Sequence, residues 1–251
     1  MLRALVPEVH RVHTSRIASA ARAIGIAAAV LFIGVPLAAQ LGIEISRSVF
    51  LLFLLGGLLG LIALVLGLIG ILRTRPDSGR EGRGRALTGT LIGAAIVGVI
   101  AVVAGPSRSL PPINDITTNP DDPPEFLAAK ELSSNQGRDL GYPADFEEQQ
   151  RAGYPDLAPI EVAQPPAVTL DRVAALVDEF GWELTARDDA SGRIEARDTS
   201  AIFHFVDDIV VRIRPRDGGS LVDVRSKSRV GQGDLGANAA RIRRLRDGLS
   251  S

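Results

Sequence analysis

The sequence predicts an α+β protein in which three transmembrane α-helices precede a two-layer domain with a four- to five-stranded antiparallel sheet and helices on one face. Three observations predict this fold class: long uncharged apolar runs in residues 1–106, a proline-rich acidic segment at 107–166, and mixed helical and strand periodicity at 167–251. The composition of the whole chain, with 46% hydrophobic residues and a formal charge of −1, does not restrict the fold class further.

The membrane anchor is predicted from three runs without charged residues, at about 23–43, 49–72 and 86–104. Crossing about 30 Å of hydrocarbon takes about 20 apolar residues, and each run has this length. Glycines four residues apart, at 56–60 and 89–93, allow close packing of the second and third helices. Because ion and proton paths need ionisable groups inside the membrane, the runs indicate an anchor rather than a transporter.

The arginines predict how the helices are oriented, because short cytoplasmic loops carry an excess of Lys and Arg. The leading tail and the loop between the second and third runs hold Arg3, Arg11, Arg16, Arg22, Arg73, Arg75, Arg80, Arg83 and Arg85, whereas the other side holds Arg47 and Arg108. We therefore expect a multi-pass protein of a bacterial inner membrane, with a cytoplasmic amino terminus and a periplasmic C-terminal domain. The alternative for the first run is a signal peptide cleaved near "PLAAQ", which leaves the other helices oriented as before.

Proline and acidic residues distinguish the segment that follows the anchor. Residues 105–166 hold eleven of the fifteen prolines, with eleven acidic and four basic residues. Such a composition is typical of an extended linker or of a segment that wraps around a domain. Its apolar side chains favour an ordered wrap with a short helix around 126–132, because a solvated linker does not need them.

The last 85 or so residues predict a small globular domain, in which helical periodicity brackets a series of short strands. A helix capped by Thr169 ends at Gly181, and a final helix covers about 235–249. Between them we expect strands at 182–187, 193–197, 201–205, 209–214 and 221–228. This order favours a two-layer domain with its helices on one face of the sheet.

Three stretches of this region are distinctive: "INDITTNPDDPPEF", "FVDDIVVRIRP" and "VDVRSKSRVGQGDLGANAARI". Together they resemble the domain-of-unknown-function family 1499 (DUF1499), over roughly residues 111–249. The resemblance implies bacterial envelope proteins and some plastid relatives, without an established activity or catalytic residues. It also implies that the proline-rich segment and the sheet form one unit.

The third stretch alternates between two faces of its strand. A turn at 217–218 sets Arg212 opposite Asp223, and a turn at 218–219 sets Arg214 there instead. Either register leaves Arg225, Lys227 and Arg229 without an acidic partner on these two strands, so we expect a basic face across which the acidic segment lies.

The residues after this strand allow two interpretations. The favoured one is structural closure, in which Asp234 caps the last helix and Asn238 binds the glycine turn together with Ser226 or Ser228. The other is a site for an anionic ligand or a partner, formed by Arg225, Arg229, Gly231, Gly233, Asn238 and Arg241. Asp234 and the acidic segment both count against a bound anion.

Catalysis has less support in the sequence. A serine hydrolase would use Ser226 or Ser228 with His204 and an adjacent carboxylate, Asp207 or Asp208, but neither serine lies in a nucleophile-elbow motif. The acidic pairs at 121–122 and 207–208 lack metal-ligand spacing, and no cofactor motif is present. Nucleic acid is not an expected partner for an outward-facing domain of balanced charge.

The sequence therefore favours a membrane-anchored periplasmic binding or scaffold protein of the bacterial envelope, whose partner is an envelope protein or an anionic ligand. The alternative is a hydrolase that acts on an envelope substrate.

Overall fold

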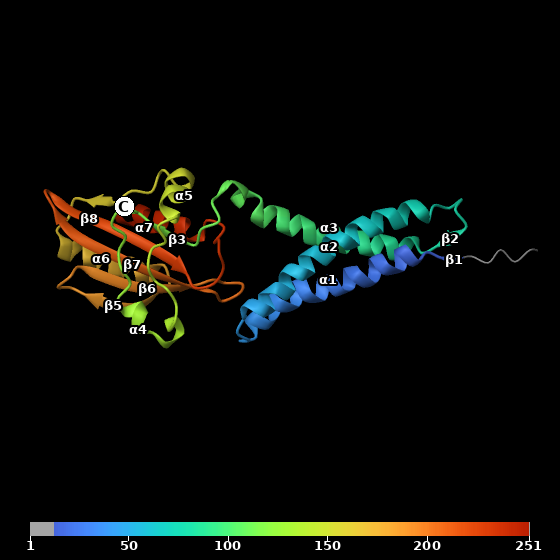
Figure 1. Cartoon of the computed structure of the whole chain (residues 1–251), viewed down its shortest axis with the longest axis horizontal. Coiled ribbons are helices and arrows are strands. Elements are labelled where there is room, and N and C mark those ends of the chain that lie inside the picture. Colours follow the sequence, from blue (N-terminus) through green and yellow to red (C-terminus); the bar gives the residue numbers. More distant parts are fainter. Residues whose placement is uncertain (1–12, 251) are drawn as a thin grey trace, which may run out of the picture. The chain divides into compact units, whose positions relative to one another are not determined.

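A computed structural model of the chain describes residues 13–250. The chain divides into two compact units, Met1–Gly105 and Pro106–Ser251, which Figure 1 shows in blue to green and in green to red. Each unit is described separately below.

The first unit is a bundle of three helices, each long and apolar enough to cross a membrane, as predicted. They are α1 (Arg16–Gln40), α2 (Arg47–Arg73) and α3 (Arg83–Ala104). Helix α1 begins seven residues before its uncharged run because Ser15 caps it, accepting a hydrogen bond from the Ala18 N–H. Two short parallel strands, β1 (His13–Thr14) and β2 (Arg80–Glu81), join the start of α1 to the α2–α3 loop.

Small residues bring the three helices into contact. A Cβ placed on Gly56 would lie 2.8 Å from the backbone nitrogen of Phe32, and one on Gly60 would lie 2.8 Å from the side chain of Ile96. On α3, Gly89 lies against the backbone of Ala21. The predicted glycine faces are thus confirmed as the surfaces of close packing.

The second unit is built on a six-stranded antiparallel sheet with the order β3-β8-β7-β6-β5, and β4 also pairs with β8. The strands are β3 (Asp115–Thr117), β4 (Ile160–Val162), β5 (Glu183–Asp188), β6 (Arg193–Thr199), β7 (Val206–Arg216) and β8 (Gly219–Ser228). The β7–β8 turn at 217–218 uses Gly218 at φ +80°, so Arg212 pairs with Asp223. This is the first of the two predicted registers.

One face of the sheet, here the helix face, packs against α6 (Pro166–Glu179) and α7 (Ala237–Ser250). Alternate residues of β7 and β8, such as Ile209, Val211, Val222 and Val224, form the core with both helices. The α+β class and the helices on one face are therefore as predicted.

The opposite face, here the wrap face, is covered by part of the proline-rich residues 107–166, here the wrap segment (Figure 1). Other residues of the segment, such as Ile113 and Tyr154, pack in the core of the helix face. Besides β3 and β4, this segment contains the short helices η1 (Pro106–Ser109), α4 (Ala128–Glu131), η2 (Ser133–Asn135) and α5 (Phe146–Gly153). Phe126, Ala129 and Leu140 of the wrap segment form a second buried cluster with Val210 of β7.

Two predicted elements need correction. Residues 201–205 do not form a strand but a turn, because β6 and β7 pair directly across it. The Ser200 N–H donates to the Phe205 carbonyl and the Phe205 N–H donates to the Ser200 hydroxyl, and these two bonds close the turn. The last helix starts at Ala237, because Leu235 at φ +55° cannot continue a right-handed helix. Leu235 is 60% exposed and does not pack in the core with the apolar residues of α7.

Candidate functional site

A buried carboxylate and two cations lie at the centre of the wrap face. In the register of the sheet, Asp115 of β3 pairs with Lys227 of β8. The Asp115 carboxylate accepts two hydrogen bonds from the Arg225 guanidinium, at 2.9 and 2.7 Å, and one from the Lys227 ammonium at 2.8 Å. Asp115 is 0% and Arg225 2% exposed, so this ion-paired cluster is shielded from solvent.

Arg225 also holds the wrap segment in place. Its guanidinium donates to the carbonyl oxygens of Pro124 at 3.1 Å and Leu140 at 2.8 Å. The rings of Phe126 and Tyr142 lie 4.8 and 5.5 Å from its central carbon, within the range of a cation–π contact. One side chain of β8 therefore binds two separate turns of the wrap segment in addition to strand β3.

The other cations of this face are paired as well. Arg229 binds Asp208 at 2.6 Å, and Arg212 and Arg214 both bind Asp223, at 2.8 and 2.7 Å. Arg225 and Lys227 have their acidic partner on β3 and not on β7 or β8, as expected, whereas the expectation was wrong for Arg229, which pairs with Asp208 of β7. Strand β7 begins at Val206, earlier than predicted, and this places Asp208 on the wrap face.

Glu195 is a structurally important residue of this face that the sequence interpretation missed. Its buried carboxylate accepts hydrogen bonds from the backbone N–H groups of Leu127, Ala128 and Ala129, at 2.6, 3.0 and 2.8 Å. It thereby supplies the cap that the first turn of α4 lacks from its own residues. The available signal was a glutamate between Ile194 and Ala196, the two apolar residues of this strand.

The helix face carries a second polar network, centred on Asn238 at 0% exposure. Its side-chain oxygen accepts from the Ser226 hydroxyl at 2.6 Å, and its amide donates to Ser228 Oγ at 2.9 Å and to the Asn114 carbonyl at 3.1 Å. Asp234 accepts from the Asn238 backbone N–H at 2.7 Å, which caps α7. These contacts are those of the closure interpretation.

Arg241 completes this network at its edge. Its guanidinium donates to the Asn238 oxygen at 2.8 Å and pairs with Asp198 and Asp207, both at 2.8 Å. Burial raises the pKa of Asp207 above its usual range, with Arg241 and Ser228 acting in the opposite direction. The charge of Arg241 is thus balanced within the domain.

We expect Asn238→Ala to lower the free energy of unfolding by about 1–3 kcal/mol, because Ser228 and the Asn114 carbonyl would lose their buried partner. Chemical denaturation of the 106–251 unit measures the change. Gln149→Ala is the matched control, since it removes an exposed amide that makes a single hydrogen bond. Equal losses in the two variants would contradict the role given to Asn238.

The six residues proposed from sequence as an anion or partner site do not converge. Arg225 and Arg229 lie on the wrap face, while Asn238 and Arg241 lie on the helix face. The two glycines form the connecting turn: the Gly231 carbonyl accepts from Asn114, and Gly233 lies close to Pro112. The residues instead belong to two separate networks.

Ser226 and Ser228, the two serines proposed as a nucleophile, both form hydrogen bonds within the Asn238 network. The Ser226 hydroxyl donates to Asn238 and accepts from Arg241 at 3.0 Å, and its side chain is fully buried. A nucleophilic serine needs its proton directed at a base and its oxygen open to the substrate. His204, the proposed base, lies in the turn between β6 and β7 with φ +53°.

A hollow opens on the wrap face beside the ion-paired cluster, with a volume of about 450 Å³. It is lined by Pro120, Asp121, Asp122, Pro123, Glu125, Lys130, Leu140, Gly141, Tyr142, Ala144, Glu147 and Arg225. Four of these residues are acidic and only two are basic, so the hollow favours a cationic group over an anion. Burial, followed by the nearby Asp115 charge, raises the pKa of Tyr142, which keeps its hydroxyl neutral.

The family comparison concerns this same region. A family model described as a protein of unknown function, DUF1499, matches residues 115–249. The chain belongs to this family. The DUF1499 match begins at Asp115, the first residue of β3, and ends within α7, so it includes most of the wrap segment, the whole sheet and both polar networks. A search of curated proteins found no match.

The DUF1499 boundaries agree with the resemblance seen in the sequence, and the family description carries no activity. The hollow, the ion-paired cluster and Glu195 all lie inside the matched range.

Proposed function

We propose that this protein is a membrane-anchored binding or scaffold protein of the bacterial envelope, and that the hollow on the wrap face is its binding site. The observation that carries the proposal is the hollow itself, about 450 Å³ in volume, beside the buried Arg225–Asp115 pair. Because Arg225 fixes the turns of the wrap segment at Pro124 and Leu140, the hollow is preformed and requires little ordering on binding.

The chemistry of the rim supports a cationic partner segment, such as lysine or arginine side chains of an envelope protein. Asp121 and Glu147 share Arg151, at 2.8 and 3.2 Å, and Glu125 lies 3.6 Å from Lys130. These pairs are exposed and contribute little to stability, so an incoming cation can replace the internal partner. The ring of Tyr142 adds a surface for a cation–π contact.

Site-specific photocrosslinking in intact membranes tests the proposal. A crosslinker at Ala144, which lines the hollow, should give a discrete adduct, whereas one at the exposed Val168 of α6 should not. The double charge reversal Asp121→Lys with Glu147→Lys should abolish the Ala144 adduct and leave the unfolding transition nearly unchanged. Adducts that are the same at both positions, or insensitive to the charge reversal, would refute binding at the hollow.

We further propose the inner membrane as the location, with the amino terminus in the cytoplasm and the Pro106–Ser251 unit in the periplasm, on the ground of the arginine distribution. We expect an alkaline phosphatase fused after Ser251 to be active and one fused in the 73–85 loop to be inactive. The reverse pattern of activity would refute this orientation. Retention of α1 is supported by its packing. A Cβ placed on Gly25 would lie 3.4 Å from the Cα of Gly89 on α3 and 3.6 Å from the Cβ of Ala63 on α2, so α1 packs closely against both other helices.

A further inference from the structure

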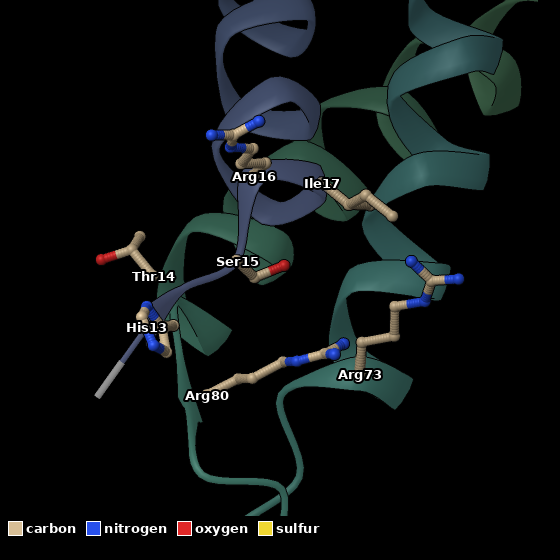
Figure 2. A pocket seen from close by; sticks show the side chains of 7 residues that line it. All are labelled: His13, Thr14, Ser15, Arg16, Ile17, Arg73 and Arg80. Carbon is tan, nitrogen blue, oxygen red and sulfur yellow. The ribbon is translucent and has the colours of Figure 1, made fainter. Parts of the chain in front are cut away.

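The cytoplasmic-loop end of the helical unit contains a second cavity, with a volume of about 170 Å³. Figure 2 shows the residues that line it: His13, Thr14, Ser15, Arg16, Ile17, Arg73 and Arg80. Three separate elements contribute the arginines: Arg16 begins α1, Arg73 ends α2 and Arg80 lies in β2. Neither the packing of the helices nor the proposed binding hollow accounts for this arrangement.

Backbone hydrogen bonds fix the elements that surround this cavity. Strand β2 pairs with β1, with His13 opposite Arg80, and the Ser15 N–H donates to the Glu81 carbonyl at 2.9 Å. These bonds fix the start of α1 against the loop that carries Arg80. The Arg80 side chain extends from this loop toward the end of α2, where Arg73 lies (Figure 2).

The charges of the cavity are unbalanced. Within residues 13–250, none of Arg16, Arg73 and Arg80 forms an ion pair with a carboxylate, whereas each of the arginines on the wrap face that we described does. Like charges around one cavity repel each other, and a bound anion would remove this repulsion. Ser15 adds a further donor: it is 8% exposed, and its oxygen already accepts from Ala18, which leaves its hydroxyl proton for another acceptor.

The position of the cavity along the helices selects the anion. Helix α2 has 27 residues. It is therefore about 40 Å long, whereas the hydrocarbon core is about 30 Å thick. Its ends therefore reach the headgroup layer, and Arg73 is its last residue. At that depth the abundant anion is the phosphate of a phospholipid, which arginine binds through paired N–H groups.

We propose that this cavity binds the phosphate of an anionic phospholipid, with Arg73 and Arg80 as its principal ligands, and that it fixes the helical unit to one leaflet. The inference is independent of the proposed binding function of the periplasmic unit. It would hold whether the hollow binds a cationic or an anionic partner.

Native mass spectrometry of the full chain in nonionic detergent tests the inference, with dioleoyl phosphatidylglycerol as the probe. We expect one tightly retained lipid in the wild type and a Kd raised about tenfold or more in Arg73→Gln with Arg80→Gln. The matched control is Arg75→Gln with Arg83→Gln, which removes the same charge from the same loop outside the cavity; its Kd should stay within about twofold of wild type.

Arg80→Gln alone, in a short exposed strand, provides a second variant if the double substitution impairs folding; we expect it to raise the Kd by about threefold or more. Equal losses in the two double variants would overturn the proposal, because they would indicate attraction to the overall charge. Equal retention of dioleoyl phosphatidylcholine would overturn it too. Displacement of the lipid by inorganic phosphate at comparable concentration would show a free-anion site instead, which also contradicts a lipid site.

Discussion

Replacing Asp115 with asparagine is expected to lower the free energy of unfolding of the 106–251 unit by about 3–5 kcal/mol. The substitution keeps the size of the side chain but removes the carboxylate charge that pairs with both Arg225 and Lys227. Two cations would then remain in a largely buried site, and an unpaired buried charge is among the most costly defects in a protein. Urea denaturation followed by the fluorescence of Trp182 measures the loss.

Asp156→Asn is the matched control for this result. Asp156 binds Arg243 at the same distance of 2.7 Å, but both side chains are partly exposed, so we expect a loss below about 1 kcal/mol. A loss for Asp115→Asn as small as that of the control would mean that water reaches the cluster in solution. It would contradict the description of Arg225 as a buried clamp.

Glu195→Ala should open the wrap segment locally. The substitution leaves the N–H groups of Leu127, Ala128 and Ala129 without an acceptor in a buried position, at an expected cost of about 2–4 kcal/mol. Limited trypsin digestion measures the opening, because Lys130 and η2-adjacent Arg138 lie in the released part. Cleavage at these two positions should accelerate before the rest of the domain is cut.

Glu183→Ala on the neighbouring strand β5 is the control, since it removes an exposed carboxylate that binds Arg197. Its digestion pattern should match that of the wild type. If both variants released the wrap segment at the same rate, Glu195 would not be its anchor. Cleavage across the whole segment in the wild type, as fast as in an unfolded peptide, would show that the segment is a loose tether.

Local patterns explain which parts of the fold were predictable. The three apolar runs, α6 and the β7–β8 hairpin all depend on residues close in sequence. The predicted cap of α6 was wrong, because the helix begins at Pro166 and Thr169 lies inside it. The hairpin register followed from the Asp-Gly turn, and the place of Asn238 beside Ser226 and Ser228 followed from alternation on β8. Strands β3 and β4 were not predictable in this way, because three residues between prolines show no periodicity.

The cations of the site were predictable and their partners were not. Arg225 could be assigned to the correct face from the period of two along β8, but Asp115 is 110 positions away in the chain. Nothing in the local sequence reports such a contact. The false strand at 201–205 had the opposite cause, since Ile202, Phe203 and Phe205 have strand propensity but occupy a turn.

The pairing of β3 with β8 has a mechanical consequence. Strand β3 is the first element of the sheet to follow the anchor in the chain, and ten residues separate it from the end of α3. A pulling force between the membrane and a bound partner would therefore load the β3–β8 pairing and the Arg225–Asp115 contact before any other part of the sheet. Since Arg225 also lines the hollow, such a load would act on the shape of the proposed binding surface, and tension would be coupled to affinity.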